Sequence, residues 1–155
     1  MADTFEFISP TDRPALLGLS NPEWLAKCRA GLSELGFKTH MAANHEDFLS
    51  RFQQVHYQVA LLEERFAANS LEENLSLQGL QHMAMNQRRH ATIFLLGDSF
   101  VSLHPMQAFQ QSVHAVVNPA ELTSLTAILQ QVVADNDLFL QVFRDTVMQI
   151  TAWGK

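Results

Sequence analysis

Apolar and polar residues follow two patterns in turn along this chain of 155 residues. Short, nearly continuous apolar runs indicate buried strands, whereas apolar residues that recur every three or four positions indicate amphipathic helices. The two patterns alternate, as expected of an α/β protein with a parallel sheet and helices on both of its faces. Five apolar runs predict strands, at residues 15–19, 37–42, 59–62, 92–96 and 113–117.

Helical patterns lie between most of these strands. The first, around Trp24 and Leu32, ends where Gly36 offers a C-terminal stop. Further helices are predicted at 45–55, 73–89 and 120–134. Pro105 interrupts the segment 97–111 and permits only a short helix that begins at the proline.

The chain continues beyond these strand–helix units. After a polar break at 135–137, a strongly apolar helix is predicted at 137–153. Six of its large apolar residues form a broad stripe: Leu138, Phe139, Val142, Phe143, Val147 and Ile150. Leaving such a stripe in water would cost on the order of 10 kcal/mol, so it needs a cover. The helix either folds back on its own domain or packs against a second copy of the chain, and a homodimer is the favoured expectation.

The pattern divides the chain into three parts. Residues 1–13 are an N-terminal arm or an edge strand, in which Phe5 and Phe7 alternate with polar neighbours. Residues 14–134 form one domain, and residues 135–155 form a C-terminal helical extension. With 47% hydrophobic residues, the chain can bury one full-sized core.

Composition and charge exclude several classes of function. The net charge is −6 and no basic cluster is longer than Arg88-Arg89, which argues against a nucleic-acid partner. The single cysteine, Cys28, can form neither an intrachain disulfide nor a Cys-rich zinc site. The N-terminus does not resemble a signal peptide, and no apolar stretch approaches the roughly 20 residues that span a bilayer. We therefore expect a soluble, cytoplasmic protein without a membrane partner.

Two carboxylates stand where the third strand ends. In YQVALLEERF, residues 57–66, the apolar run leads directly into Glu63 and Glu64, and Asp98 follows the fourth strand. Ligands and catalytic groups collect at the carboxyl ends of parallel strands. A divalent cation normally recruits more convergent oxygens than these, and the seven histidines show no metal-binding spacing. No metal or other cofactor is therefore predicted.

Five strand–helix units, with acids after the third strand and the pair Asn118-Pro119 after the fifth, resemble the receiver domain of two-component response regulators. The resemblance covers roughly residues 14–134. It implies a flavodoxin-like three-layer sandwich whose five parallel strands lie in the order 2-1-3-4-5, with the C-terminal helix as an addition.

The resemblance also assigns a phosphoacceptor pocket. Receivers transfer a phosphoryl group to an aspartate that ends the third strand. Here that position holds Glu63, whose carboxylate extends one methylene further. The acidic pair that holds Mg²⁺ corresponds to Ser20 and Asn21, the hydroxyl residue of strand four to Leu96, and the lysine after strand five to Asn118. We therefore expect a degenerate receiver with no catalytic residues, which is not an enzyme.

The two proline-containing stretches also have a structural interpretation as helix starts. In SNPE, residues 20–23, either Asn21 caps a helix that begins with Pro22, or Ser20 and Glu23 form a capping box. The stretch NPAE, residues 118–121, offers the same choice.

Two functions follow from these observations. A receiver-like pocket without its charged groups favours a signalling module that acts through protein–protein contacts, as a homodimer. The alternative is a domain that binds a small ligand or a metal in the crevice at the carboxyl ends of the strands. Glu64 and Asp98 would be contacts in that crevice.

Overall fold

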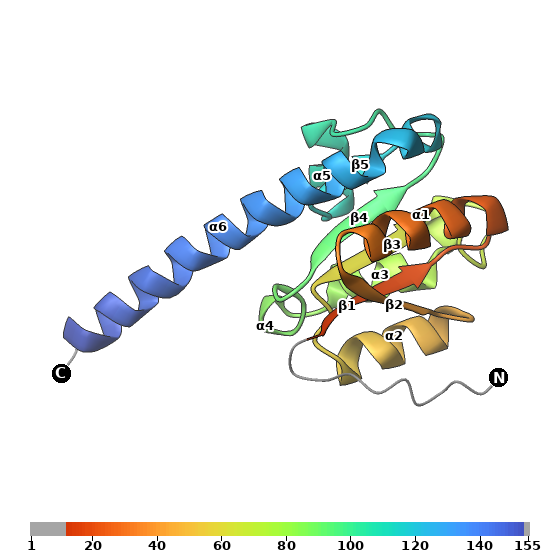
Figure 1. Ribbon diagram of the computed structural model, residues 1–155. Coiled ribbons are helices and arrows are strands. Elements are labelled where there is room, and N and C mark those ends of the chain that lie inside the picture. The colour runs from red at the N-terminus through yellow and green to blue at the C-terminus, as the bar shows by residue number, and fades with distance from the viewer. Residues whose placement is uncertain (1–11, 154–155) are drawn as a thin grey trace.

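The computed structural model describes residues 12–153. The expected arm or edge strand at 1–13 lies outside the described residues up to residue 11, and Arg13 already belongs to the first strand. Within them, five parallel strands form a sheet in the order β2-β1-β3-β4-β5 (Figure 1). The strands are β1 (Arg13–Gly18), β2 (Phe37–Met41), β3 (Val59–Glu63), β4 (Thr92–Leu96) and β5 (Ala115–Val117). The predicted α/β fold class and strand order are confirmed.

Helices connect the strands and cover both faces of the sheet (Figure 1). They are α1 (Pro22–Glu34), α2 (His45–Gln54), the 3₁₀ helix η2 (Leu71–Glu73), α3 (Leu75–His82), α4 (Met85–Arg88), α5 (Pro105–Gln111), the 3₁₀ helix η3 (Pro119–Ser124) and α6 (Leu125–Trp153). One core joins alternate strand residues to α1 and α6, and the other joins the remaining strand residues to α2, α3 and α5. The result is the predicted three-layer sandwich.

The strands are apolar along their whole length because both of their faces are buried. Leu17 of β1 belongs to the core on the α1 and α6 side, together with Leu32 and Leu129. Its neighbour Leu16 belongs to the opposite core, together with Phe48 of α2. Successive side chains of a strand point to opposite faces, so one apolar run supplies both cores.

Asparagine residues begin four of the helices. Asn21, Asn44, Asn74 and Asn118 each accept a backbone N–H with the side-chain oxygen at the start of α1, α2, α3 and η3. In the stretch 20–23, Asn21 Oδ1 accepts the N–H of Glu23 at 3.0 Å and of Trp24 at 3.2 Å. Of the two predicted arrangements, the structure adopts the asparagine cap with Pro22 in the first helical position.

Two of the predicted helix boundaries are wrong. The helix expected at 73–89 is divided, because α3 ends at His82 and α4 begins at Met85. The break expected at 135–137 does not exist, and α6 runs without interruption from Leu125 to Trp153. Each Asp or Asn inside a helix lowers helix stability by only about 0.7 kcal/mol or less relative to alanine. Here Asn136 also donates a hydrogen bond from Nδ2 to Thr92 Oγ1 at 2.9 Å, which fixes this part of α6 to β4.

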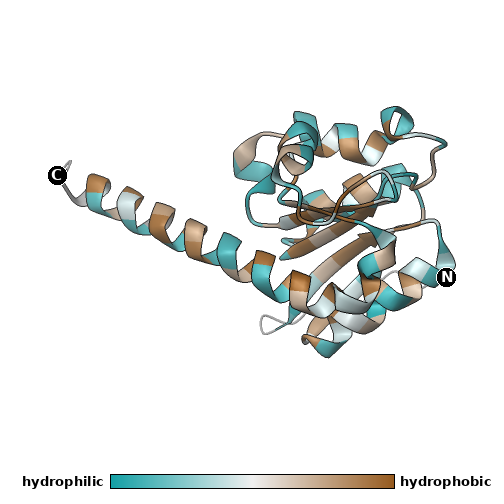
Figure 2. Ribbon diagram, turned by 90° about the horizontal axis from the view of Figure 1, so that it is seen from above, coloured by the Kyte–Doolittle hydropathy of each residue, from teal (hydrophilic) through white to brown (hydrophobic). Residues whose placement is uncertain are grey.

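The helix α6 extends far beyond the sandwich (Figures 1 and 2). Its first half contributes Leu125, Leu129 and Val133 to the core. In the contact between α1 and α6, Gly31 lies close to Leu125: a Cβ atom at residue 31 would be 3.4 Å from Leu125, which is near ordinary contact. Among the described residues, no helix is both long enough and apolar enough to cross a membrane.

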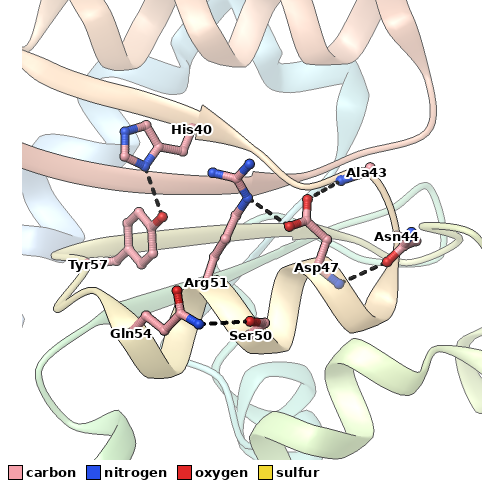
Figure 3. A network of polar contacts seen from close by, with 8 residues as sticks. All are labelled: His40, Ala43, Asn44, Asp47, Ser50, Arg51, Gln54 and Tyr57. Carbon is pink, nitrogen blue, oxygen red and sulfur yellow. Dashed lines mark hydrogen bonds and ion pairs between the residues drawn. The ribbon is translucent and has the colours of Figure 1, made fainter. Parts of the chain in front are cut away.

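A polar network joins α2 to the loop that leads out of β2 (Figure 3). Asp47 accepts the backbone N–H of Ala43 at 2.8 Å and the Nε–H of Arg51 at 2.9 Å. Nearby, His40 Nδ1 of β2 lies 2.9 Å from the hydroxyl of Tyr57, and both of these side chains are buried. The network sets the direction in which the chain leaves β2.

Candidate functional site

The candidate site lies where the parallel strands end. Gly18 pairs with Leu62, and Glu63 pairs with Leu96, so the last residues of β1, β3 and β4 lie side by side. The loops after these strands carry the sequence-predicted site residues. The sheet therefore brings Ser20, Asn21, Glu63, Glu64 and Leu96 to one edge, as the strand pattern predicts.

The Glu63 carboxylate is bound by the backbone of the β1–α1 loop. Its Oε1 accepts the N–H of Ser20 at 2.7 Å and the N–H of Asn21 at 3.0 Å. The residue is only 6% exposed. Hydrogen bonds from N–H groups to a carboxylate are about twice as strong as bonds between neutral groups, so this contact holds the side chain in one place.

Ser20 connects the β1–α1 loop to the loop that follows β3. Its hydroxyl accepts the N–H of Ala67 at 2.8 Å and lies 3.5 Å from the carbonyl oxygen of Arg65. Ser20 thus joins the β1–α1 loop to the loop after β3. Both its backbone and its side chain are used in contacts within the chain.

Glu64 lies across the end of β4. Its backbone N–H donates to the carbonyl of Leu96 at 2.7 Å, which continues the ladder between β3 and β4 by one residue. Its side chain fills the space beside Gly97, where an added Cβ atom would overlap Glu64 Oε1 and meet Glu64 Cβ at 2.7 Å. Glu64 Oε1 is buried, and no hydrogen bond to it is found within the described residues.

Asn118 faces the β4–α5 loop. Its Nδ2 donates to the carbonyl of Phe100 at 2.8 Å and lies 3.4 Å from that of Asp98. Its backbone N–H donates to Ser102 Oγ at 2.8 Å. The described residues contain no cis peptide bond, so the bond between Asn118 and Pro119 is trans. Asn118 therefore acts on the loop that carries Asp98, and its contacts do not reach Glu63.

Little open space remains between these groups. A cavity of about 30 Å³ is lined by Trp24, Glu63, Glu64, Arg65, Gly97 and Asp98. This is enough for one or two water molecules and is far below the several hundred cubic ångströms of a typical small-molecule site. Within residues 12–153, no three His, Cys, Asp or Glu side chains are grouped as a metal site would require.

Asn74 is a central residue of the site that sequence reasoning missed. It is completely buried, and its Nδ2 donates to the carbonyls of Glu63 and Glu64 at 2.9 and 3.1 Å. Its Oδ1 accepts the N–H of Leu77 at the start of α3, at 3.1 Å. Asn74 lies eleven residues beyond the end of β3, and only the path of the loop brings it back. The local signal was an asparagine directly before a helical pattern.

The histidines take structural places. His45 Nδ1 accepts the N–H of Ser76 at 3.1 Å, which joins the starts of α2 and α3. His114 is exposed when the whole residue is considered, but its Nδ1 accepts the N–H of Ile93 at 2.9 Å. Burial of the imidazole ring, followed by the positive charge of Arg88, lowers the pKa of His114 to about 4. The pKa of His90 is lowered to about 4, mainly because the ring is buried and secondarily because the charge of the neighbouring His56 disfavours a second positive charge.

The predicted interface residues are exposed. Leu138, Phe139, Val142, Phe143, Val147 and Ile150 retain between 41% and 68% of their accessible surface. Among the extension residues whose side chains the structure describes, Leu140 on the domain-facing side of α6 is the buried one. Within residues 12–153, the apolar stripe of the extension is therefore largely uncovered, although Arg89 of the α4–β4 loop lies over the ring of Phe143.

Comparisons with known proteins agree with the fold. No family model and no curated protein matches the sequence. A CheY-like receiver domain from Methanospirillum hungatei has a TM-score of 0.63 and 13% identity, over 82% of this chain and 98% of that chain. An orphan response regulator of H. pylori has a TM-score of 0.59 and 16% identity, over 77% and 95%.

The receiver domain of a sensor histidine kinase from Pseudomonas aeruginosa is similar as well. Its TM-score is 0.59 and its identity 19%, over 79% of this chain and 98% of that chain, and a magnesium ion is coordinated in its active-site cleft. Identities this low establish the fold and leave the activity open. The sandwich of this chain is thus a receiver-like, CheY-like fold of the flavodoxin type.

Proposed function

We propose that this chain is a receiver-like signalling module that does not accept a phosphoryl group and acts through protein–protein contacts, as a homodimer. The observation that carries the first part is the contact of Glu63 with the β1–α1 loop. The carboxylate at the phosphoacceptor position accepts two backbone N–H groups and is directed toward Ser20 and Asn21.

This geometry supports the proposal that Glu63 does not accept a phosphoryl group. An attacking carboxylate oxygen must reach the phosphorus in line, and a displacement of about 1 Å can cost roughly 10²-fold in rate. Glu63 is buried beside a cavity of only about 30 Å³. The carboxylate resembles a permanent internal charge that holds the loop in one conformation.

The groups that would neutralise a phosphoryl charge are also different. Asn118 stands in the place of the lysine and donates its side-chain N–H groups to the β4–α5 loop. Leu96, in the place of the hydroxyl residue, is an apolar core residue. Phosphoryl transfer depends almost entirely on such positioning and charge stabilisation. We therefore infer that the chain is not an enzyme.

The part of the proposal that concerns partners rests on α6. Exposed apolar patches of this kind mark interaction surfaces in proteins that are otherwise folded. The exposed residues lie on a helix that is already fixed to the domain through its first half. A partner that covers the second half would gain apolar burial without first having to order the helix.

The phosphoryl part is tested with acetyl phosphate and Mg²⁺. We expect no acid-labile phosphate on the protein by intact mass spectrometry, with an active receiver domain treated in parallel as the positive control. In addition, amide shifts of Ser20, Asn21, Glu63 and Leu96 should stay unchanged when Mg²⁺ and beryllofluoride are added. A phosphorylated species, or saturable shifts at these residues, would overturn the proposal.

One observation favours the alternative, a small ligand or cation bound in the crevice. Glu64 presents a buried oxygen that has no hydrogen-bond partner within residues 12–153, beside the small cavity that Asp98 also lines. If the alternative is right, Mg²⁺ or Ca²⁺ alone should shift the amides of Glu64, Gly97 and Asp98 in a saturable way. A Glu64→Gln variant should then abolish the shifts.

The homodimer is tested by light scattering of the full chain. At tens of micromolar, we expect the mass of two copies. A mass of one copy at this concentration would contradict the dimer and would leave the phosphoryl part of the proposal standing.

A further inference from the structure

Apolar residues recur along one face of α6 past the point where the helix leaves its own domain. Val133, Leu140 and Val147 are spaced by seven residues and therefore lie on nearly the same face. Val133 and Leu140 are buried, whereas Val147 is 44% exposed. The same face of α6 is therefore buried against the domain up to Leu140 and exposed at Val147.

A groove lies beside Leu140, where this face of α6 becomes exposed. It has a volume of about 610 Å³, between α6 and the residues of α4 and α5. On the α6 side it is lined by Asn136, Phe139 and Leu140. On the opposite side, Met85 and Phe109 line it and are 65% and 78% exposed. The groove therefore has apolar walls of its own that need a cover.

The distal half of α6 cannot fill the groove of its own domain. The helix is continuous through Trp153, and its distal half points away from the sandwich (Figure 2). A helix reverses direction only at a break, and none is present between Leu125 and Trp153. Within residues 12–153, no other segment fills the groove, so we look for its occupant in another molecule.

We propose that this occupant is the distal half of α6 from a second copy of the chain. The inference rests on the homodimer of the proposed function and specifies its geometry. The two α6 helices lie antiparallel, and each places Val147 and Ile150 in the groove of the other copy. Both grooves and both distal stripes are then covered by one two-fold arrangement, which closes the assembly at two copies.

The spacing along α6 fits a two-fold axis at Phe143. Phe139 and Val147 lie four residues before and after it, so an antiparallel pair places them opposite each other. Asn136 and Ile150 lie seven residues before and after it and meet in the same way. The residues that line the groove are thus the symmetry counterparts of the uncovered distal residues.

The first test uses charge substitutions on both sides of the contact, measured by sedimentation equilibrium of the full chain. Val147→Glu on α6 and Phe109→Glu on α5 should each raise the dimer dissociation constant at least tenfold. Gln149→Glu on α6 and Met106→Glu on α5 are matched controls on exposed positions outside the groove, and they should leave the dissociation constant unchanged. Far-UV circular dichroism checks that all four variants keep the wild-type fold.

The second test measures the direction of the helices by cross-linking in a Cys28→Ser background. A Phe143→Cys variant should form a disulfide between copies on oxidation, because the residue lies at the axis. An Ile150→Cys variant should not, since the two copies of residue 150 are then about 20 Å apart along the helices. A disulfide requires Cα atoms within about 7 Å.

The outcomes separate this inference from the dimer itself. A wild-type monomer would overturn both. A dimer that Val147→Glu weakens and Phe109→Glu does not would keep the homodimer but overturn the groove contact. Efficient Ile150→Cys cross-linking would indicate parallel helices and would also overturn it. Weakening by both variants, with cross-linking at Phe143→Cys only, supports the antiparallel exchange.

Discussion

Glu63 Oε1 at the end of β3 accepts the backbone N–H of Asn21 at 3.0 Å, and Asn21 in turn caps the first turn of α1. The carboxylate thus lies at the N-terminus of a helix, where the partial positive charge of the helix dipole favours it. The same carboxylate holds Ser20. The Glu63 carboxylate at the end of β3 therefore holds the β1–α1 loop in place.

Glu63→Ala should destabilise the protein by about 3 kcal/mol. The change removes the acceptor of two charge-assisted hydrogen bonds and leaves the N–H groups of Ser20 and Asn21 unpaired in a partly buried loop. Glu63→Gln keeps an acceptor oxygen and should cost only about 1 kcal/mol. Urea unfolding measures both. A Glu63→Ala variant as stable as Glu63→Gln would contradict the assigned contact.

Asn74→Ala should destabilise the protein by about 3 kcal/mol as well, because three hydrogen bonds of a fully buried side chain are lost together. Asn74→Asp keeps the cap of α3 but cannot donate to the carbonyls of Glu63 and Glu64. If donation matters, Asn74→Asp should be close to Asn74→Ala in urea unfolding. Stability close to the wild type would show that only the cap matters.

Gly97→Ala should destabilise the protein by about 1 to 3 kcal/mol, since the new Cβ would overlap Glu64, including its Cβ at 2.7 Å. Gly31→Ala in α1 is the matched control. Its Cβ would meet Leu125 at 3.4 Å, which is near ordinary contact, and alanine is favoured by about 0.5 to 1 kcal/mol inside a helix. Thermal unfolding should therefore rank Gly31→Ala at or above the wild type and Gly97→Ala below it.

Stability should decrease as the pH falls from 6.5 to about 4. Burial lowers the pKa of His90 and of His114 to about 4 in the folded chain, whereas an unfolded histidine titrates near 6.5. The unfolded state therefore binds more protons in this window, so the stabilisation is complete above pH 6.5 and lost as the pH falls through about 4. We expect these two residues to contribute about 2 kcal/mol, because solvent screens both partly exposed rings.

The measurement is urea unfolding at several pH values, compared between the wild type and a His90→Gln/His114→Gln variant. The carboxylates titrate in both proteins, so the difference between the two slopes isolates the histidines. Equal slopes would contradict the prediction. Histidine ring shifts in NMR spectra should independently show two midpoints well below 6.

The strands were predictable because their physical cause is local in sequence. A strand that is buried on both faces must be apolar at every position, so the run from Val59 to Leu62 could be recognised without any knowledge of its neighbours. The helix starts at 20–23 and 118–121 were recognisable for the same reason, although two capping arrangements stayed open at each; Asn21 acts on residues only two and three positions away.

The helix boundaries at 135–137 and 82–85 were not predictable in this way. The polar stretch after Ala134 has the composition of a loop, but Asn136 finds its partner, Thr92, on β4. A contact between residues so far apart in sequence is not visible in local spacing. It lets α6 continue where propensity alone would favour an end.

The sequence by itself determined the alternation of strands and helices, the residues that lie at the carboxyl ends of the strands, and the presence of an apolar C-terminal helix. Each of these depends on side-chain character at short spacing, which burial imposes residue by residue. Only the tertiary structure decided that Glu63 binds the β1–α1 loop, that Asn74 returns to β3, and that α6 leaves the domain as one helix. Those outcomes depend on which donors and acceptors meet across the sheet, and only the folded chain brings them together.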